Sequence, residues 1–496
     1  MKVTKAVIKR HRDSAAEYRT YKFKKEVNKV KVIKNYNDLE LGGNAKTHYF
    51  EMAIQKFEAG KKRSAQEYFS DAIKLNPKYA EAYNNLGVLK YGYDKYYHGA
   101  ELYYREAIKI NPNLVEAHNN LGVLLKDSNH HEQARNNFEI LLKDSTYYEE
   151  AEKEFREAIR LNPDYAEVHN NLGILLTYLK RYEEAEKEYE VAIKLNPNDA
   201  DIHYNLGNLL YLLKRYEEAE KEFREAIRIN PDDAEAHNNL GILLTYLKRY
   251  EEAEKELREA IRINPDDAEA HNNLGLLLKD LKRYEEAAKE YRRVIRINPD
   301  DAEAHNNLGL LFSLYYYDGA ENEFKLAIEL NQDYADAHNN LGNLLQKVKR
   351  YEEAEKEYRE AIRLNPDYAE VHNNLGNLLQ KVKRYEEAEK EYGEAIRLNQ
   401  YHADAHYNLG NLLHKVKRGN LLQKVKRDRE AEKEYKKAIK INPDDSEAYY
   451  YFGNLLKFLK RYEEAEIKYR AAIRINPNYA EAHINLGFLL KFKNKI

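Results

Sequence analysis

The spacing of prolines and glycines is the feature that most constrains this chain. All ten prolines fall at one phase of a repeat, and intervals of 34 residues recur between them. Twelve of the twenty glycines share a second phase, from Gly87 to Gly487. A period of this length is typical of stacked supersecondary units, each of which can bury its apolar face only against a neighbour. The chain is therefore predicted to be a repeat array and not a globular domain.

One unit, residues 234–267, shows how the repeat is expected to fold. Apolar residues recur at three- and four-residue steps in each half, as they do on one face of an α-helix. A short connection at 247–249 separates the halves, which predicts a helix-turn-helix. Pro265 cannot continue a helix, so the second helix should end at or just before the residue preceding it. Asp266 is then expected to cap the next helix, with Glu269 as its capping-box partner.

This unit resembles the tetratricopeptide repeat (TPR), a helix-turn-helix of 34 residues. The positions that carry the resemblance are Leu240, Gly241, Ala253, Leu257, Ala260 and Pro265. The resemblance covers residues 46–496 as about twelve units and a terminal helix. It implies an all-α fold, a right-handed α-solenoid or superhelix whose first helices line a concave side. The array looks similar to the TPR superhelix of O-linked N-acetylglucosamine transferases.

Two stretches interrupt the period. The interval from Gly122 to Gly173 is 51 residues, and parts of 124–157 repeat one another, which predicts an extra helix made by duplicating a second helix. Within 410–427, GNLLHKVKR is followed directly by GNLLQKVKR. Nine residues are two and a half helical turns, so a break or kink is expected near Gly419. These irregularities could serve as a hinge or contact surface, or could be neutral products of replication slippage.

Charge is distributed unevenly along the chain. Residues 1–45, which lie outside the array, carry twelve Lys or Arg and five Asp or Glu, a formal charge of +7. Since the whole chain carries −3, the remainder carries −10. The basic arm is expected to be disordered or partly helical. The acidic array makes nucleic acid an unlikely main partner, because phosphates require positive charge.

Composition excludes several classes of protein. No apolar run approaches the ~18 residues that a membrane-spanning helix needs, so no membrane insertion is expected and the protein is predicted to be cytoplasmic. Cysteine is absent, which excludes disulfides and thiol chemistry. No phosphate loop, nucleophile elbow or dinucleotide fingerprint occurs. Because the repeat occupies most of the chain, neither an enzyme nor a cofactor is expected.

An asparagine ladder is the first candidate binding feature, at the position immediately before the recurring Leu-Gly. An asparagine amide both donates and accepts hydrogen bonds, so a regular row could bind the backbone of an extended peptide. In the transferase superhelix that the array resembles, a ladder at this place contacts peptide backbone. Alternatively, each asparagine bonds the backbone of a neighbouring repeat. The predicted ladder of the peptide-binding groove is Asn171, Asn205, Asn239, Asn273, Asn307, Asn340, Asn374 and Asn408.

Two further positions on the first helices vary along the array. One turn after the ladder, isoleucine and leucine give way to asparagine, and one turn further on, tyrosine and leucine give way to lysine. The groove is therefore expected to become polar and basic from about 335 to 418. A partner with an apolar segment followed by an acidic one would fit, although the lysines could also be a solvated face. The predicted contacts are Asn343, Asn377, Asn411, Lys347, Lys381 and Lys415.

A histidine row shares one phase of the repeat and raises the question of a metal site. Each histidine comes from a separate repeat, without the i,i+4 spacing or the carboxylate cluster of a helical metal site. This position is a packing position in the TPR family, so no metal site is predicted. The row is His118, His169, His203, His237, His271, His305, His338, His372, His406 and His483.

The leading functional prediction is a non-catalytic scaffold that binds extended segments of other proteins in a concave groove. One alternative is the targeting subunit of a glycosyltransferase-type complex. An RNA-binding helical array is disfavoured by the glutamates along the first helices. A self-assembling structural or filament protein is a further alternative, because the final helix, 480–496, is rich in apolar residues such as Phe488. Exposed apolar patches mark contact sites, so a homo-oligomer through this helix is possible.

Overall fold

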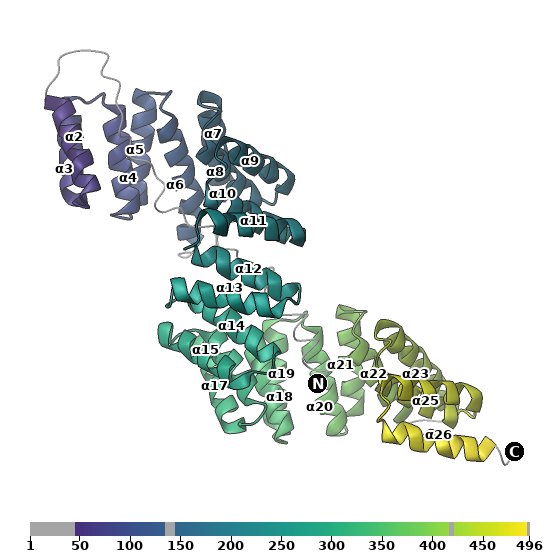
Figure 1. Cartoon of the computed structure of the whole chain (residues 1–496). Helices are drawn as coiled ribbons and strands as arrows, with labels where there is room; N and C mark the ends of the chain where they lie inside the picture. Colours follow the sequence, from purple (N-terminus) through teal and green to yellow (C-terminus); the bar gives the residue numbers. More distant parts are fainter. Residues whose placement is uncertain (1–44, 134–143, 416–420, 494–496) are drawn as a thin grey trace. The chain divides into compact units, whose positions relative to one another are not determined.

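The computed structural model describes residues 45–133, 144–415 and 421–493. These residues form 25 α-helices and no strand (Figure 1). The predicted all-α fold of two-helix repeat units is confirmed. The chain divides into two compact units, the first ending at Pro265 and the second beginning at Asp266.

The first unit consists of consecutive antiparallel helix pairs, and each second helix also contacts the first helix of the next pair. Its pairs are α2 (Ala45–Glu58) with α3 (Lys62–Leu75), α4 (Ala80–Gly92) with α5 (Tyr97–Ile110), α6 (Val115–Gln133) with α7 (Asp144–Leu161), α8 (Ala166–Tyr178) with α9 (Tyr182–Leu195), α10 (Ala200–Leu212) with α11 (Tyr216–Ile229), and α12 (Ala234–Tyr246) with α13 (Tyr250–Ile263).

The second unit follows the same plan and ends in a single first-type helix, α26 (Ala480–Lys493). Its pairs are α14 (Ala268–Asp280) with α15 (Tyr284–Ile297), α16 (Ala302–Phe312) with α17 (Tyr317–Leu330), α18 (Ala335–Lys347) with α19 (Tyr351–Leu364), α20 (Ala369–Lys381) with α21 (Tyr385–Leu398), α22 (Ala403–Lys415) with α23 (Leu421–Ile441), and α24 (Ser446–Phe458) with α25 (Tyr462–Ile475).

A Schellman motif closes the first helix of most pairs. After α12, Arg249 N–H donates to Leu244 C=O at 2.9 Å and Lys248 N–H donates to Thr245 C=O at 3.0 Å. Lys248 therefore adopts the left-handed region, with φ of 62°, where a non-glycine residue is disfavoured by about 1–2 kcal/mol. The same lysine conformation recurs at Lys180, Lys214, Lys282, Lys349, Lys383 and Lys460. Each turn thus places an arginine directly at the start of the second helix.

The cap of α14 corrects one sequence-based prediction. Asp267, and not Asp266, is the N-cap, and its carboxylate accepts the N–H of Glu269 at 3.0 Å. The predicted cap is wrong by one residue: two adjacent aspartates follow Pro265, and the one that directly precedes Ala268, the first residue of α14, provides the cap. Asp266 instead lies 2.9 Å from Arg293 Nη2. The predicted end of the preceding helix is confirmed, since α13 stops two residues before the proline.

The core of each pair lies where the shared glycine meets a large side chain of the second helix. A Cβ atom added at Gly376 would lie 2.6 Å from Cε1 of Tyr392, and Tyr392 is fully buried between two buried alanines, Ala388 and Ala395. Such a distance is too short for carbon atoms in contact. The close approach of the two helices therefore requires glycine here, which explains the regular glycine phase.

Some sequence-based predictions lie outside the described residues. The arm at 1–45 is described only at Ala45, where α2 begins. Part of the irregular stretch, 134–143, is not described, so the predicted extra helix is not tested; α6 extends to Gln133 and spans 19 residues. The predicted break near Gly419 lies within 416–420, which is also not described, and α23 begins immediately afterwards.

A matched pair of substitutions tests the close-approach argument. Gly376→Ala should lower the free energy of unfolding by about 1–3 kcal/mol, because the added methyl group overpacks the core. Gly393→Ala, on the exposed side of α21 where an added Cβ meets nothing within 4 Å, should raise it by about 0.5–1 kcal/mol. Urea unfolding followed by circular dichroism measures both, and equal effects would contradict the argument.

Candidate functional site

The asparagine ladder runs through the contacts between successive first helices. In the first unit, Asn171 Nδ2 donates to Asn119 Oδ1 at 2.9 Å and Asn205 Nδ2 donates to Asn170 Oδ1 at 3.1 Å, and all four side chains are buried. In the second unit the same bond, at 2.9–3.0 Å, joins Asn307 to Asn272, Asn340 to Asn306, Asn374 to Asn339, and Asn408 to Asn373.

The ladder member Asn239 also bonds the preceding first helix, but through different acceptors. Asn239 Nδ2 donates to Tyr204 Oη at 3.0 Å and to Asn208 Oδ1 at 2.9 Å, because tyrosine replaces the usual asparagine in α10. Asn273 is buried at the equivalent position in α14. The amide donors of these ladder members therefore tie neighbouring repeats together, but through side-chain acceptors and not through the backbone acceptors of the second alternative. Contact between the ladder and a peptide stays a prediction.

Ladder asparagines should accordingly matter for stability. Asn171→Ala should lower the free energy of unfolding by about 1–3 kcal/mol, because it removes the donor to a buried amide oxygen of Asn119. As a matched change, Asn343→Ala removes an exposed asparagine one turn after the ladder. Its tyrosine partner, Tyr358, keeps a second acceptor in Gln346 Oε1 at 3.1 Å, so stability should change by less than about 0.5 kcal/mol. Thermal unfolding compares the two variants, and equal stability losses would argue against a structural ladder.

The predicted asparagines one turn after the ladder have their carbonyl oxygens occupied by the second helix of the same pair. Tyr358 Oη donates to Asn343 Oδ1, and Tyr392 Oη to Asn377 Oδ1, both at 2.8 Å. Asn411, which is buried, accepts from the tyrosine of α23 in the same way at 2.7 Å. In the exposed Asn343 and Asn377, the amide nitrogen is therefore the donor left to bind a ligand, whereas the side chain of Asn411 also hydrogen-bonds Tyr407.

The three predicted lysines lie at the C-terminal ends of α18, α20 and α22, and all are exposed. Each ammonium lies near an aromatic ring: Lys347 Nζ is 4.7 Å from the centre of Tyr317, Lys381 Nζ is 5.4 Å from Tyr351, and Lys415 Nζ is 5.5 Å from Tyr451. Lys347 Nζ also donates to the backbone oxygen of Ser313 at 3.0 Å. Cation–π contacts of this kind orient the side chains without neutralising their charge.

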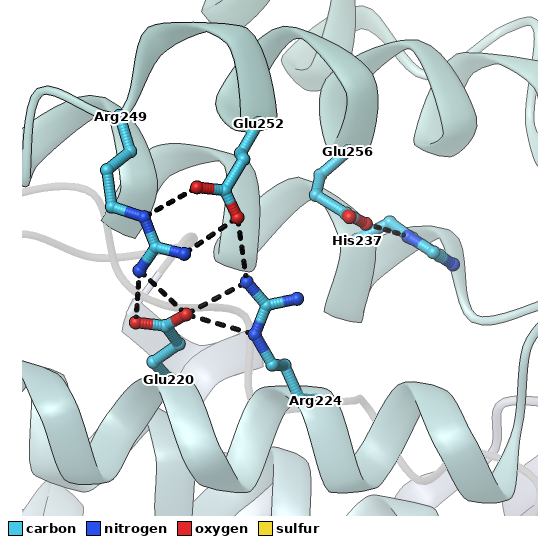
Figure 2. Close-up of polar contacts among 6 residues, drawn as sticks. All are labelled: Glu220, Arg224, His237, Arg249, Glu252 and Glu256. Atoms are coloured by element: carbon cyan, nitrogen blue, oxygen red, sulfur yellow. Dashed lines mark hydrogen bonds and ion pairs between the residues drawn. The ribbon is translucent and has the colours of Figure 1, made fainter.

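Carboxylates on the second helices are taken up by arginines (Figure 2). Arg249, at the turn before α13, lies 2.7 Å from Glu220 of α11 and 2.7 Å from Glu252 of its own helix. The hydrogen bond from Arg249 lowers the pKa of Glu252 below its usual value. The arrangement recurs between neighbouring pairs as Arg181–Glu152, Arg215–Glu186, Arg350–Glu321, Arg384–Glu355 and Arg461–Glu432. These glutamates are thus partners in ion pairs, and each ion pair contributes about 0–1 kcal/mol to the free energy of unfolding.

Both ring nitrogens are engaged in row histidines such as His118, His169, His203 and His237. His237 Nδ1 lies 2.6 Å from Glu256 Oε2 on the second helix (Figure 2), and Nε2 lies 3.2 Å from the backbone oxygen of Pro231. Equivalent histidine–glutamate pairs occur at His169–Glu188, His203–Glu222, His271–Glu290, His305–Glu323, His338–Glu357 and His372–Glu391. Across the part of the chain that the structure describes, no group of three His, Asp or Glu side chains could hold a metal ion.

These contacts perturb the histidines of the first unit. Burial lowers the pKa of His118, His169, His203 and His237, but the hydrogen bonds that their rings donate to glutamate and proline oxygens raise it more, so that the pKa of each lies above its ordinary value of 6.5. A ring that faces an acceptor at each nitrogen needs a proton on both, which favours the imidazolium form.

The histidines should therefore make stability depend on pH. Since their folded pKa is raised, their stabilising contribution is complete below pH 6.5 and is lost as pH rises through the folded pKa. The urea midpoint should fall between about pH 6 and about pH 8. His203→Gln with His237→Gln should reduce this fall, whereas His98→Gln, at an exposed position, should not. A double variant with the wild-type pH profile would contradict the assignment.

The final helix, α26, buries one face and exposes another. Leu486 and Leu489 pack with Phe452 and Tyr469 of the preceding pair, whereas Ile484 is 56% exposed and Phe488 63% exposed. Self-association through this exposed face stays a prediction.

Family comparisons agree with the repeat architecture. Models of the tetratricopeptide repeat match residues 50–114, 140–199, 176–234, 238–302, 272–312, 333–400, 103–136, 434–467 and 415–445, and a model described as TPR repeat matches 453–491. These matches cover most of the chain, so the protein belongs to the tetratricopeptide repeat family. Such arrays typically bind other proteins and are typically non-catalytic, and this chain has the architecture of a protein-interaction scaffold.

Solved structures of other TPR proteins resemble the chain at low identity. Yeast Tom70 is 17% identical, with 91% of this chain and 96% of Tom70 covered and a TM-score of 0.44. YrrB, described as a TPR protein with an unusual peptide-binding site, is 24% identical, with 40% and 97% covered and a TM-score of 0.32. Pseudomonas aeruginosa PilF is 23% identical, with 40% of this chain and 92% of PilF covered and a TM-score of 0.37.

At TM-scores below 0.5, none of these structures supports an inference about partners. No curated protein compared with the chain matches it. None of the described helices is both long and apolar enough to cross a membrane.

Proposed function

We propose that this protein is a non-catalytic scaffold that holds extended segments of other proteins along the first helices of its second unit. The observation that carries the proposal is a row of hydrogen-bond donors on α18, α20 and α22. In each helix an asparagine whose oxygen is already bonded to a tyrosine stands four residues before a lysine without a carboxylate partner among the described residues. The exposed donor pairs of α18 and α20, followed by Lys415 of α22, suit a ligand that runs across the helices.

Many side chains that could do acid–base chemistry take part in structural contacts instead, which supports a binding role. His237 bonds a carboxylate and a carbonyl, and Glu220 and Glu252 bond Arg249. A general acid or base must be free to exchange a proton with substrate, and these groups are not.

The ladder has a positioning role in this proposal. Asn374 and Asn408 bond the preceding first helix, so they hold α18, α20 and α22 side by side. Asn343, Asn377 and the lysines then face the ligand. The partner's identity decides between a general scaffold and the targeting subunit of a glycosyltransferase-type complex, which would co-purify with transferase activity.

Affinity capture from a native extract tests the proposed face. The full chain should enrich a client that Asn343→Ala with Asn377→Ala loses, because the variant removes two outward donors without touching the ladder. Lys356→Ala with Lys390→Ala, at exposed positions on the second helices of the same two pairs, should retain the client.

Equal enrichment by all three proteins would place the interaction elsewhere and contradict the proposal. A third bait, with Asn340, Asn374 and Asn408 changed to alanine, separates direct contact from positioning. If this bait folds normally and loses a client that the Asn343/Asn377 variant keeps, the ladder itself binds the partner and the proposed division of roles is wrong.

A further inference from the structure

We propose that the protein segment bound by the lysine row (Lys347, Lys381 and Lys415) is acidic and extended. It has one carboxylate at every third residue and an apolar side chain at each end. This inference rests on the proposed function and specifies the class of partner. Four features of the second unit lead to it: the spacing of the lysines, the geometry of the donors, the local charge and the boundaries of the row.

Spacing sets the period of the ligand. Successive first helices contact one another directly, as the bonds Asn374–Asn339 at 3.0 Å and Asn408–Asn373 at 2.9 Å require. Helices in contact lie about 8–10 Å apart, so lysines at one phase of successive repeats have about this separation. An extended chain advances about 3.3 Å per residue. Three residues of ligand therefore span one repeat.

The donors set the chemistry of each step. Asn343 and Lys347 are four residues apart on α18, a rise of about 6 Å, and Asn377 and Lys381 repeat this relation on α20. The ammonium can only donate, and the asparagine oxygen is already bonded to tyrosine. Each repeat therefore offers an amide N–H for a backbone carbonyl and an ammonium for a carboxylate.

Charge at this edge of the first helices favours an anion. Glutamates of the adjoining second helix are paired with arginines: Glu353 lies 2.5 Å from Arg350, and Glu355 lies 2.6 Å from Arg384. In the part of the chain that the structure describes, no salt bridge engages the row lysines. The acid of the same first helix, Asp336, stands eleven residues before the lysine, about 16 Å along the axis. This distance exceeds the Debye length of about 8 Å in physiological salt.

The row has apolar side chains at both boundaries. Leu314 is 51% exposed and follows Ser313, whose backbone oxygen accepts from the first lysine at 3.0 Å. Phe458, 48% exposed, occupies the lysine phase in α24, and its ring lies 5.4 Å from that of His414, next to the last lysine. The ligand is therefore bounded by apolar contacts, which a peptide with an apolar residue at each end supplies and a uniform polyanion does not.

Fluorescence anisotropy with synthetic peptides tests the inference on the full chain. The probe is a labelled peptide of thirteen residues with leucine at both ends, aspartate at positions four, seven and ten, and glycine or serine elsewhere. The comparison peptide has the same composition with its three aspartates adjacent. Because a spaced peptide can reach all three lysines, we expect it to bind about tenfold more tightly, with an affinity that weakens as salt rises.

Charge-matched variants locate the site. Lys347→Gln, Lys381→Gln and Lys415→Gln together should weaken binding of the spaced peptide about tenfold. Lys356→Gln, Lys390→Gln and Lys433→Gln remove the same charge from exposed positions on the second helices of the same pairs and should leave binding unchanged. Circular dichroism establishes that both variants fold.

Three outcomes would overturn the inference: equal binding of both peptides, equal losses in both variants, or a short single-stranded oligonucleotide that binds the row more tightly than the spaced peptide. The last would assign the lysines to nucleic acid. If the spaced peptide does not bind while capture of the client still depends on Asn343 and Asn377, the proposed function is retained. Only the inference of an acidic ligand with a carboxylate at every third residue is then rejected.

Discussion

The arrangement of this array depends on how closely the two helices of each pair approach one another. A glycine on the first helix and a buried aromatic or leucine on the second set that distance, and an added Cβ at Gly376 would lie 2.6 Å from the ring of Tyr392. The same ring determines more than packing. Its hydroxyl bonds Asn377 Oδ1 at 2.8 Å, so the residue that fills the core also turns an amide donor of the first helix outward. Core geometry and surface chemistry are coupled through one side chain in each of these repeats.

Each type of polar side chain bonds a different neighbouring helix. Histidines bond the glutamate of the second helix in their own pair, ladder asparagines bond the preceding first helix, and arginines join adjacent second helices. Such nearest-neighbour contacts are what stabilise repeat proteins, in which each unit touches only those beside it. Against this background the lysines of α18, α20 and α22 differ, because they contact aromatic rings and have no carboxylate partner within the described repeats. They provide the basis for a role toward another molecule.

Sequence periodicity predicted the helix pairs, their turns and the proline-limited helix ends, because these depend on local conformational rules. The N-cap was missed by one residue because two adjacent aspartates can both cap, and the path of the chain after Pro265 selects Asp267. The bonds of the ladder were left open because they depend on how repeats stack. Two site features had a readable signal: a glutamate recurs 19 residues after most row histidines, and a tyrosine recurs 15 residues after Asn343, Asn377 and Asn454. Neither spacing falls within one helix, so helix periodicity alone could not reveal them.

The ladder bond has a direction: each repeat donates from one asparagine and accepts, from the other side, on the asparagine before it. Every internal junction built this way joins the same donor to the same acceptor. A whole unit can therefore be gained or lost between two others without leaving a buried amide unmatched, whereas a fractional unit would put the two asparagines out of register. The array is in this sense a directional polymer of repeats. Its gene can gain or lose 34 codons at a time, and the bonds at every remaining junction between repeats stay the same.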